Sequence, residues 1–416
     1  MNNKIDFLPV LLGSDQNAYG MARSFHEAYG ITSVAIGKGQ LPATDNSRIV
    51  KVAVEEPRLE EDEVFVKTLL DYAASVASAG KKLLLVSCGD NYTKLLARNQ
   101  DKLKGAYLFN STDSKTYERL SIKKNFYDVC DEFGFDYPKT VECDYSNYKN
   151  IETPFEFPIV IKPSNSVAYW NCSFQGKKKV FIASSEPEFR AILDAIYSSS
   201  YKDTLVLQEF IPGNDDAMRV VNCYCGMDGK VRLLVMGNVL LEEHTAQGIG
   251  SYAAIIPGRD DALAAQIIGF LEKIGYTGFI NIDLKKDCRD GTGKYKFFEM
   301  NLRQGRSSYF VTAAGYNLAK FLVDDVVYGK KQKLVIGEAG GCLWSIIPAK
   351  VIYAFVGNEE LKAQAKALVK SGKHIKHLLY KPDMTPKRYL YFIINQHKYM
   401  KKYKENFQKK GYDIKK

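Results

Sequence analysis

Residues 296–308, KFFEMNLRQGRSS, combine a carboxylate, an amide and two guanidinium groups at the end of one apolar run. Glu299 and Asn301 lie two positions apart and would therefore share one face of a strand. Arg303 and Arg306 follow at once. Carboxylate and amide oxygens are ligands for a hard divalent cation, and guanidinium groups bind phosphate or carboxylate through paired hydrogen bonds. The stretch therefore indicates a site for a cation and an anion together.

A second apolar run brings another carboxylate toward this stretch. Asp283 follows the strand-like residues FINI, and a Gly-rich turn at 288–294 separates it from Glu299. An antiparallel hairpin would set Asp283, Glu299 and Asn301 on neighbouring strands, where three oxygen donors suit Mg²⁺. Solvated polar strand ends are the alternative interpretation.

Two further apolar strands end in groups that require a ligand or a partner. Lys162 closes PIVIKP, where a buried charge is costly unless it meets an anion. VLQEFIPG ends in Gln208 and Glu209, followed by Phe210 and Ile211. A hinge of this type offers an apolar slot and backbone hydrogen bonds to an adenine ring. Together these strands predict a Mg²⁺–nucleotide site.

The elements that must position these groups fall into two kinds. Residues 7–29 and 82–99 each read as a continuous apolar strand, a turn (GSD at 13–15, CGD at 88–90) and a helix. This order predicts a three-layer α/β domain with a parallel sheet. Beyond it, strands and helices mix without strict β-α-β order, which predicts α+β units. The expected divisions are 1–112, 113–207, 208–330 and a C-terminal region, 331–416.

The ordered set Lys123, VIKP, QEFIPG, NID and FEMNLR resembles the ATP-grasp superfamily of carboxylate–amine ligases over about residues 5–330. The resemblance implies the ATP-grasp fold, in which an N-terminal α/β domain precedes two α+β halves that close on Mg-ATP. It also implies that a carboxylate is phosphorylated to an acylphosphate, from which an amine displaces the phosphate.

A closer resemblance spans nearly the whole chain. PVLLGSDQNAYGMARSFHEAYG, FYDVCDEFGFDYPKT, KPSNSVAYW, FIPGNDDAMRVVN and FEMNLRQGRSSYFVT are similar to the D-aspartate ligases of Gram-positive bacteria. That family joins the β-carboxylate of D-aspartate to the lysine side-chain amine of the UDP-MurNAc-pentapeptide peptidoglycan precursor. The implied substrates are therefore ATP, D-aspartate and this precursor.

The resemblance implies roles for individual residues. For ATP it implies phosphate contacts from Lys123 and Lys162, an adenine site at Gln208, Glu209, Phe210 and Ile211, and ribose contacts from Asp215 or Asp216. For magnesium, with two ions expected, it implies Asp283, Glu299 and Asn301. Arg303 is expected on the transferring phosphoryl group.

Two departures from the superfamily pattern stand out. The segment from Ser164 to Lys179, where a glycine-rich phosphate lid is expected, contains Gly176 alone, so Ser164 and the lysines at 177–179 are the candidates for that task. Asn281 stands where the D-alanine–D-alanine ligase branch has an arginine. The partner of the acylphosphate is then expected to be Arg303, Arg306 or Arg219.

Several of these residues have a structural alternative. Arg219 would form either a salt bridge to the neighbouring aspartates or a contact to phosphate or donor carboxylate. Arg306 with Ser307 and Ser308 would bind the α-carboxylate of the donor, unless the serines only cap a helix. The GSD turn at 13–15 would hold the donor at a helix start or be a simple turn. The loop at 245–252 is either an acceptor-side loop or a turn.

Composition and charge narrow the class of protein. With 416 residues, 46% hydrophobic and 25% charged, the chain is globular, and it has neither a signal-peptide core nor an apolar run long enough for a membrane span. We expect a cytoplasmic protein. Residues 371–416 contain 13 Lys/Arg and 3 Asp/Glu, which accounts for the whole net charge of +10. Nucleic acid is not expected as a partner, because no recognised module or second basic stripe is present.

Three interpretations of the basic tail remain open. It would lie at the inner membrane face against anionic lipid, hold the diphosphate of the acceptor, or cover the domain as a solvated helix. A homodimer is a further hypothesis. For the chain as a whole, the alternatives to D-aspartate ligation are an ATP-grasp ligase with another donor or acceptor, and a nucleotide-binding protein without catalysis. The sequence does not distinguish the enantiomers of the donor.

Overall fold

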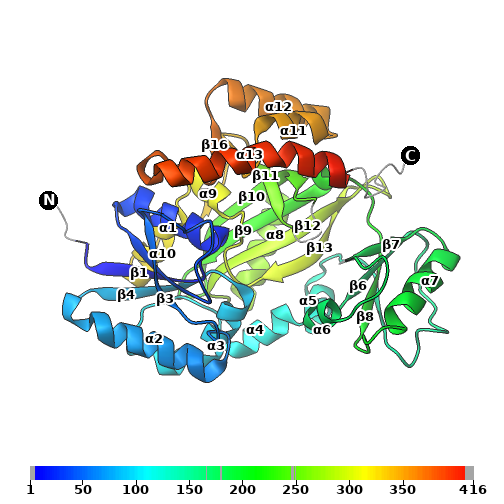
Figure 1. Cartoon of the computed structure of the whole chain (residues 1–416), viewed down its shortest axis with the longest axis horizontal. Coiled ribbons are helices and arrows are strands. Elements are labelled where there is room, and N and C mark those ends of the chain that lie inside the picture. Colours follow the sequence, from blue (N-terminus) through cyan, green and yellow to red (C-terminus); the bar gives the residue numbers. More distant parts are fainter. Residues whose placement is uncertain (1–4, 165, 179, 245–247, 249, 408–416) are drawn as a thin grey trace.

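The structure is a computed structural model, in which residues 5–164, 166–178, 180–244, 248 and 250–407 are described. These residues form three β-sheets. Figure 1 shows a four-stranded N-terminal sheet at one end, an eight-stranded central sheet in the middle and a small four-stranded sheet at the other end. This arrangement of α/β and α+β units is the one that the sequence predicts.

The N-terminal sheet is parallel and has the strand order β3-β2-β1-β4. Its elements are β1 (Phe7–Leu12), α1 (Gln16–Tyr29), β2 (Ser33–Gly37), β3 (Val50–Glu55), α2 (Asp62–Val76), a 3-10 turn (Ala77–Ala79), β4 (Lys82–Ser87) and α3 (Asp90–Leu103). Phe7 and Leu11 pack on the α1 side, whereas Val10 and Leu12 pack on the α2 and α3 side. Because both faces are covered, the inner strand β1 is apolar throughout, and the expected three layers are present.

The small sheet is antiparallel, with the order β5-β8-β6-β7. It consists of β5 (Thr140–Cys143), β6 (Ile159–Pro163), β7 (Phe181–Ala183) and β8 (Leu205–Glu209), covered by α7 (Glu186–Tyr197). Helices α4 (Ser114–Ser121) and α5 (Lys123–Phe133) lead into it, and α6 (Ser166–Asn171) follows β6. The boundary expected between 207 and 208 falls inside β8, which continues to Glu209.

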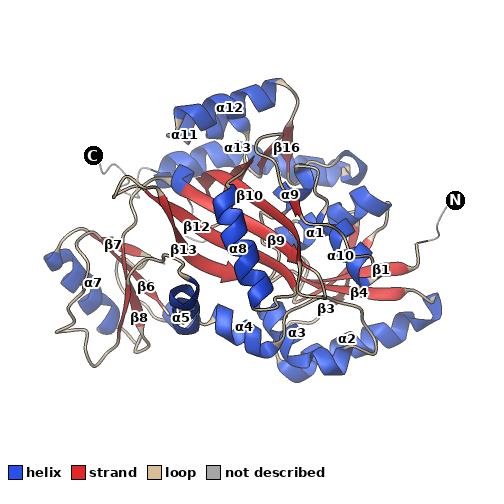
Figure 2. Cartoon of the chain, turned by 180° about the vertical axis from the view of Figure 1, so that it is seen from behind, coloured by secondary structure: helices blue, strands red, loops and turns tan. Residues whose placement is uncertain are grey.

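The central sheet has the order β13-β12-β9-β10-β11-β15-β16, and β14 pairs with β10. Its first strands are β9 (Met218–Cys225), β10 (Val231–Glu242), β11 (Tyr252–Gly258), β12 (Gly278–Asp287) and β13 (Lys294–Asn301). Helix α8 (Asp261–Lys273) crosses one face, as Figure 2 shows. Ile280, Ile282 and Leu284 of β12 pack in the core on that face. Strand alternation therefore turns Asn281, Asp283 and Lys285 to the opposite face.

The C-terminal region is joined to the central sheet and does not form a separate unit. It contains β14 (Val335–Ile336), β15 (Leu343–Ser345), α11 (Ala349–Phe355), α12 (Glu359–Lys370), β16 (His374–Lys376) and α13 (Pro386–Phe407), with a 3-10 turn at Lys381–Asp383. Helices α9 (Tyr309–Ala313) and α10 (Leu318–Val326) connect it to β13, and another 3-10 turn, Asp215–Ala217, precedes β9. Across the described ranges, no helix combines the length and apolarity that a bilayer crossing requires.

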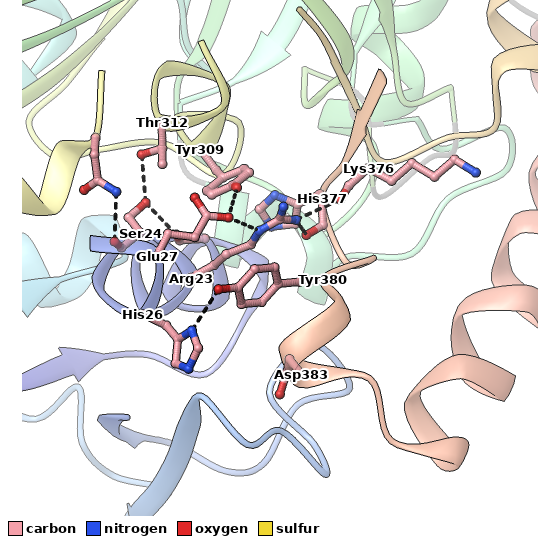
Figure 3. A network of polar contacts seen from close by, with 12 residues as sticks. Arg23, Ser24, His26, Glu27, Tyr309, Thr312, Lys376, His377, Tyr380 and Asp383 are labelled. Carbon is pink, nitrogen blue, oxygen red and sulfur yellow. Dashed lines mark hydrogen bonds and ion pairs between the residues drawn. The ribbon is translucent and has the colours of Figure 1, made fainter. Parts of the chain in front are cut away.

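A buried polar network fastens α1 to the C-terminal region (Figure 3). Arg23 donates to the backbone oxygens of Lys376 and His377 at 2.9 and 2.8 Å, and its Nε lies 2.8 Å from Glu27. The Tyr309 hydroxyl donates to the same carboxylate at 2.7 Å. Because Arg23 is buried and paired, α1 is held in one orientation relative to the central sheet.

A second buried charge lies close to this network. Asp383, which has no exposed surface, forms an ion pair with Arg388 at 3.0 Å. It also accepts hydrogen bonds from Tyr19 and Ser47, both at 2.9 Å. These contacts join the C-terminal region to two N-terminal segments, each more than 300 residues away from Asp383 in the sequence.

Candidate active site

The hairpin predicted from the sequence forms the centre of the candidate site. Strands β12 and β13 are antiparallel, with Asp283 opposite Glu299 and Asn281 opposite Asn301. The Asn301 side-chain amide donates to Asp283 Oδ2 at 3.0 Å. The register shifts after Asp283, so that Leu284 lies opposite Phe297. This β-bulge turns Phe297 into the α8-side core while Glu299 stays beside Asp283.

The two carboxylates and the amide form a set of oxygen donors for a hard cation. Burial, followed by the nearby charge of Glu299, raises the pKa of Asp283 to about 7. The Tyr252 hydroxyl donates to Asp283 Oδ1 at 2.8 Å and partly offsets this effect. Within the described ranges, no group of three or more His, Cys, Asp and Glu residues forms a metal cage. Two carboxylates and an amide oxygen suit Mg²⁺, which keeps water and phosphate in its shell.

Two lysines lie near one of these carboxylates, Glu299. Lys123 begins α5 and Lys162 belongs to β6, and their side chains lie beside each other and near Glu299. Burial, followed by the charge of Lys123, lowers the pKa of Lys162 to about 7, and burial also lowers the pKa of Lys123. Lys162 donates to Gln208 Oε1 at 3.0 Å. Two like charges with one nearby carboxylate form an arrangement that an anionic ligand would stabilise.

The hinge between the small and central sheets retains part of the expected adenine site. Glu209 is buried, and its carboxylate accepts from the Lys139 backbone at 2.9 Å and from Arg289 at 3.1 Å. Phe210 is half-buried under the Lys285 ammonium, which lies 5.6 Å from its ring centre, and Ile211 is buried. Phe210 and Ile211 therefore supply an apolar wall, while the Glu209 side chain is bound by protein groups.

The residues expected at the ribose already hold protein partners. Asp215 Oδ2 accepts from the Glu242 backbone at 2.9 Å and lies 2.5 Å from His244 Nε2. Asp216 Oδ2 accepts from the Asn358 backbone at 2.9 Å. Lys285, which sequence reasoning missed, is buried near both aspartates, and burial lowers its pKa. A lysine inside the apolar run FINIDLK is the signal that could have identified it.

Ser164 and the expected phosphate lid lie beside the small sheet. Ser164 is exposed, and its hydroxyl donates to the Thr204 backbone oxygen at 2.6 Å. The Lys177 ammonium donates to the Cys172 backbone oxygen. Lys179 and residues 245–247 and 249 of the glycine-containing loop lie outside the described residues.

The two arginines that follow β13 meet the turns of the N-terminal domain. Arg303 donates to Asp90 at 2.7 Å and lies 3.4 Å from Asn301 Oδ1. Arg306 lies 3.5 Å from Glu243, and its Nε has no hydrogen-bond partner among the described residues. Both guanidinium groups lie near Asp15, although burial raises the pKa of that carboxyl. Asp90 of the CGD turn is therefore paired with Arg303, and Asp15 of the GSD turn lies near both arginines.

The structure does not bring Arg219 to this group. In β9 it lies opposite Leu284, whose side chain packs on the α8 side of the sheet, so Arg219 and Asp283 occupy opposite faces. Its guanidinium donates to the backbone oxygens of Asp216 and Met218 at 2.8 and 2.7 Å. The role expected for Arg219 on phosphate or donor carboxylate is corrected accordingly. Successive residues of a strand point to opposite faces of the sheet, and Arg219 points to the face away from Asp283.

The two serines that follow Arg306 lie in a buried turn, where the Ser308 hydroxyl forms hydrogen bonds with protein groups. The Ser308 hydroxyl accepts from the Gly305 backbone at 2.6 Å and donates to Asn222. It makes no side-chain cap to α9, and both Ser307 and Ser308 are buried. The Ser308 hydroxyl is therefore engaged by protein groups, whereas Arg306 Nε has no partner among the described residues.

Solved structures share this fold at low sequence identity. The L-amino acid ligase from Bacillus licheniformis matches with a TM-score of 0.54 and 13% identity, over 78% of this chain and 75% of that one. An N5-carboxyaminoimidazole synthetase from Staphylococcus aureus, complexed with ADP, matches with a TM-score of 0.57 and 14% identity, over 81% and 80%. The fold is that of the ATP-grasp carboxylate–amine ligases.

Sequence comparison identifies the family within this class. No protein-family model matches the chain. A D-aspartate ligase of Enterococcus faecium (strain Aus0004) is 41% identical over 414 residues, which cover 97% of this chain and 98% of that protein. The chain belongs to the D-aspartate ligase family, and it is an ATP-dependent carboxylate–amine ligase. The alternative of a nucleotide-binding protein without catalysis is therefore set aside.

Proposed function

We propose that the enzyme activates the β-carboxylate of D-aspartate as an acylphosphate and transfers it to the lysine side-chain amine of UDP-MurNAc-pentapeptide. The name of the Enterococcus relative supports the donor, and the family resemblance supports the acceptor. The observation that carries the proposal is the half-buried pair Lys123 and Lys162 near Glu299, which lies opposite Asp283 in the hairpin. This juxtaposition of cations and carboxylates suits a triphosphate with its metal ion.

For the nucleotide, we infer that Lys123 and Lys162 hold the phosphates. An anion between these ammonium groups would raise the depressed pKa of Lys162 and so favour its charged form. Phe210 and Ile211 would wall the adenine, whose amino group and ring nitrogen would reach backbone groups of the hinge. Asp215 or Asp216 would meet the ribose if their present backbone contacts rearrange.

For the metal, Asp283, Glu299 and Asn301 would hold Mg²⁺, with two ions expected during turnover. Bound magnesium would offset the negative charge of the phosphates and of the carboxylates. The partners of Asp283 are Tyr252 and Asn301, which already orient its two oxygens. Orientation by such hydrogen bonds keeps a donor set in place before the cation arrives.

For the donor, Arg303 and Arg306 would bind two different groups. Arg303 lies next to Asn301 and would face the transferring phosphoryl group, where a fixed guanidinium stabilises developing charge. Arg306, whose Nε has no partner in the described part of the chain, would bind the α-carboxylate of the donor. The GSD turn at 13–15 would complete the donor site. Asp15 Oδ1 already accepts from the Asn17 and Ala18 backbone at 3.0 and 3.1 Å, so the Asp15 carboxylate, rather than the helix start, would meet the ammonium group of an amino acid.

The proposal also covers the division of the chain into domains and the location of the enzyme in the cell. We infer an N-terminal domain at 1–112, two ATP-grasp halves that divide at the end of β8, after Glu209, rather than between 207 and 208, and a C-terminal region at 331–416 that completes the central sheet. Both nucleotide substrates would be met in the cytoplasm. A homodimer is a separate hypothesis, which light scattering on the purified protein would test.

The deciding experiment is phosphate release from Mg-ATP with UDP-MurNAc-pentapeptide as acceptor. D-Asp, L-Asp, D-Asn and D-Glu are offered one at a time, and the product mass is measured. Release with D-Asp alone, with a product heavier by one aspartyl residue, supports the proposal. Release with another acid, or with D-Asp only when a different amine is supplied, would move the enzyme to a ligase with another donor or acceptor.

A further inference from the structure

Helix α13 has an inner face that is firmly anchored. Arg388 is buried and donates to the backbone oxygens of Ala43 and Asp45 at 3.0 and 2.7 Å. Tyr403, also buried, donates to the Glu242 backbone oxygen at 2.5 Å. Because both ends of the helix are attached to the body of the protein, its outer face has a fixed orientation, and Figure 1 shows the helix lying beside α11 and α12.

The first half of the outer face is apolar. Leu390 and Ile394 lie four residues apart, one turn along the same side of the helix, and are 61% and 43% exposed. Tyr391 flanks them at 40% exposure. Leu41, 45% exposed, lines a surface hollow together with Lys387 and Tyr391, and the exposed carboxylate of Asp45 lines the same hollow. Isolated exposed leucines are ordinary, but a contiguous group on one helix face marks an interaction surface.

The same face continues as a row of cations. Lys387 precedes Leu390 by three residues, and Lys398 and Lys401 follow Ile394 at helical spacing. Lys402 and Lys404 are exposed beside them. The single carboxylate of the helix, Glu405, lies 3.8 Å from Lys401. The outer face therefore carries an excess of positive charge around an apolar centre.

We propose that the outer face of α13, defined as Lys387, Leu390, Tyr391, Ile394, Lys398 and Lys401, binds the surface of an anionic lipid bilayer. Leucine and isoleucine side chains at the centre would enter the boundary between headgroups and acyl chains. The flanking lysines would meet lipid phosphates, as in amphipathic helices that lie in the plane of a membrane.

The charge of the outer face favours an anionic bilayer over a second copy of the chain as its partner. A two-fold dimer packed through the same face would bring two rows of lysines together, with one carboxylate on each helix to balance them. An anionic surface instead complements every lysine of the face. The proposal is independent of the donor and acceptor assigned above, because none of these side chains lies in the candidate active site.

The test is co-sedimentation of the full chain with vesicles. One set contains phosphatidylcholine with about 30% phosphatidylglycerol, and the other contains phosphatidylcholine alone. We expect binding to the anionic vesicles, and roughly tenfold weaker binding when ionic strength rises from about 0.05 to about 0.5 M. We expect Leu390→Ser with Ile394→Ser to weaken partitioning by about tenfold or more, and Lys398→Glu with Lys401→Glu to do the same.

Matched controls test whether vesicle binding depends on this face of α13 or on any exposed apolar side chain. Met227→Ser and Leu334→Ser change side chains that are 61% and 44% exposed elsewhere, and both variants should bind vesicles as the parent does. Ligase activity in solution should stay the same in every variant. Absence of binding to anionic vesicles overturns the proposal, as does binding that Leu390→Ser with Ile394→Ser leaves unchanged. A dimer in light scattering that this double variant dissociates, without vesicle binding by the parent, assigns the face to a second copy instead.

Discussion

Lys162 offers a sharp test of the electrostatics of the site, because its positive charge lowers the free energy of unfolding of the ligand-free protein. Its pKa falls from an ordinary 10.5 to about 7, first through burial and then through Lys123. Between these values the unfolded chain holds a proton on this lysine that the folded protein does not hold. The free energy of unfolding therefore rises with pH from about 7 to about 10.5.

Replacing Lys162 with methionine removes this cost. A gap of about 3.5 pKa units corresponds to roughly 5 kcal/mol at pH 7, at about 1.4 kcal/mol per unit. The lost hydrogen bond to Gln208 offsets about 1–2 kcal/mol of this gain. Without nucleotide, we expect Lys162→Met to raise the free energy of unfolding by about 3 kcal/mol at pH 7, and to lower it by about 1 kcal/mol near pH 10.5.

The measurement is urea denaturation of parent and variant, followed by circular dichroism at several pH values from about 7 to about 10.5. Lys67→Met is the matched control, because its side chain is 77% exposed in a surface pair with Asp71. It should change stability by less than about 1 kcal/mol at every pH. A variant at Lys162 that is less stable than the parent at pH 7, or a difference that does not depend on pH, would refute the reasoning.

The remaining predictions concern the metal set, the donor and the buried network. Glu299→Gln should lower ligation by about 100-fold or more while leaving the circular dichroism spectrum unchanged, and near-normal turnover would contradict its role as a metal ligand. Arg306→Ala should raise the KM for the donor by about 10- to 100-fold, measured by phosphate release, with the KM for ATP nearly constant; an unchanged donor KM would remove Arg306 from that site. Asp383→Ala leaves the buried charge of Arg388 without its carboxylate, so urea denaturation should show a loss of about 3–5 kcal/mol. Asp71→Asn, the exposed control, should lose less than about 1 kcal/mol, and an equal loss in both variants would mean that burial is not the cause.

Local patterns in the sequence predicted the hairpin and the parallel sheet. A Gly-rich turn between two apolar runs led to the β12–β13 pair, and the register places Asp283 opposite Glu299 as expected. Continuous apolar strands before the GSD and CGD turns led to the N-terminal sheet. These features depend on neighbouring residues, so hydrophobic period and turn chemistry are sufficient to predict them.

Tertiary packing decided which face each side chain occupies. A β-bulge after Asp283 separates Phe297 from Glu299, although simple alternation would place both on one face. The alternation of side chains along β9 likewise places Arg219 on the α8 side of the sheet. A shift of one residue in register reverses the face of a side chain, and the sequence alone does not state where the shift occurs.

Similarity along the chain was sufficient to establish the fold class and the family, and side-chain chemistry was sufficient to select Lys162, Asp283, Glu299 and Asn301 as candidates. Only the tertiary structure paired Arg303 with Asp90, 213 residues away, and Glu209 with Arg289. It also joined β15 and β16 to the central sheet. The physical reason is that burial, and with it the pKa of a charged group, is set by segments that are distant in sequence and meet only when the chain is folded.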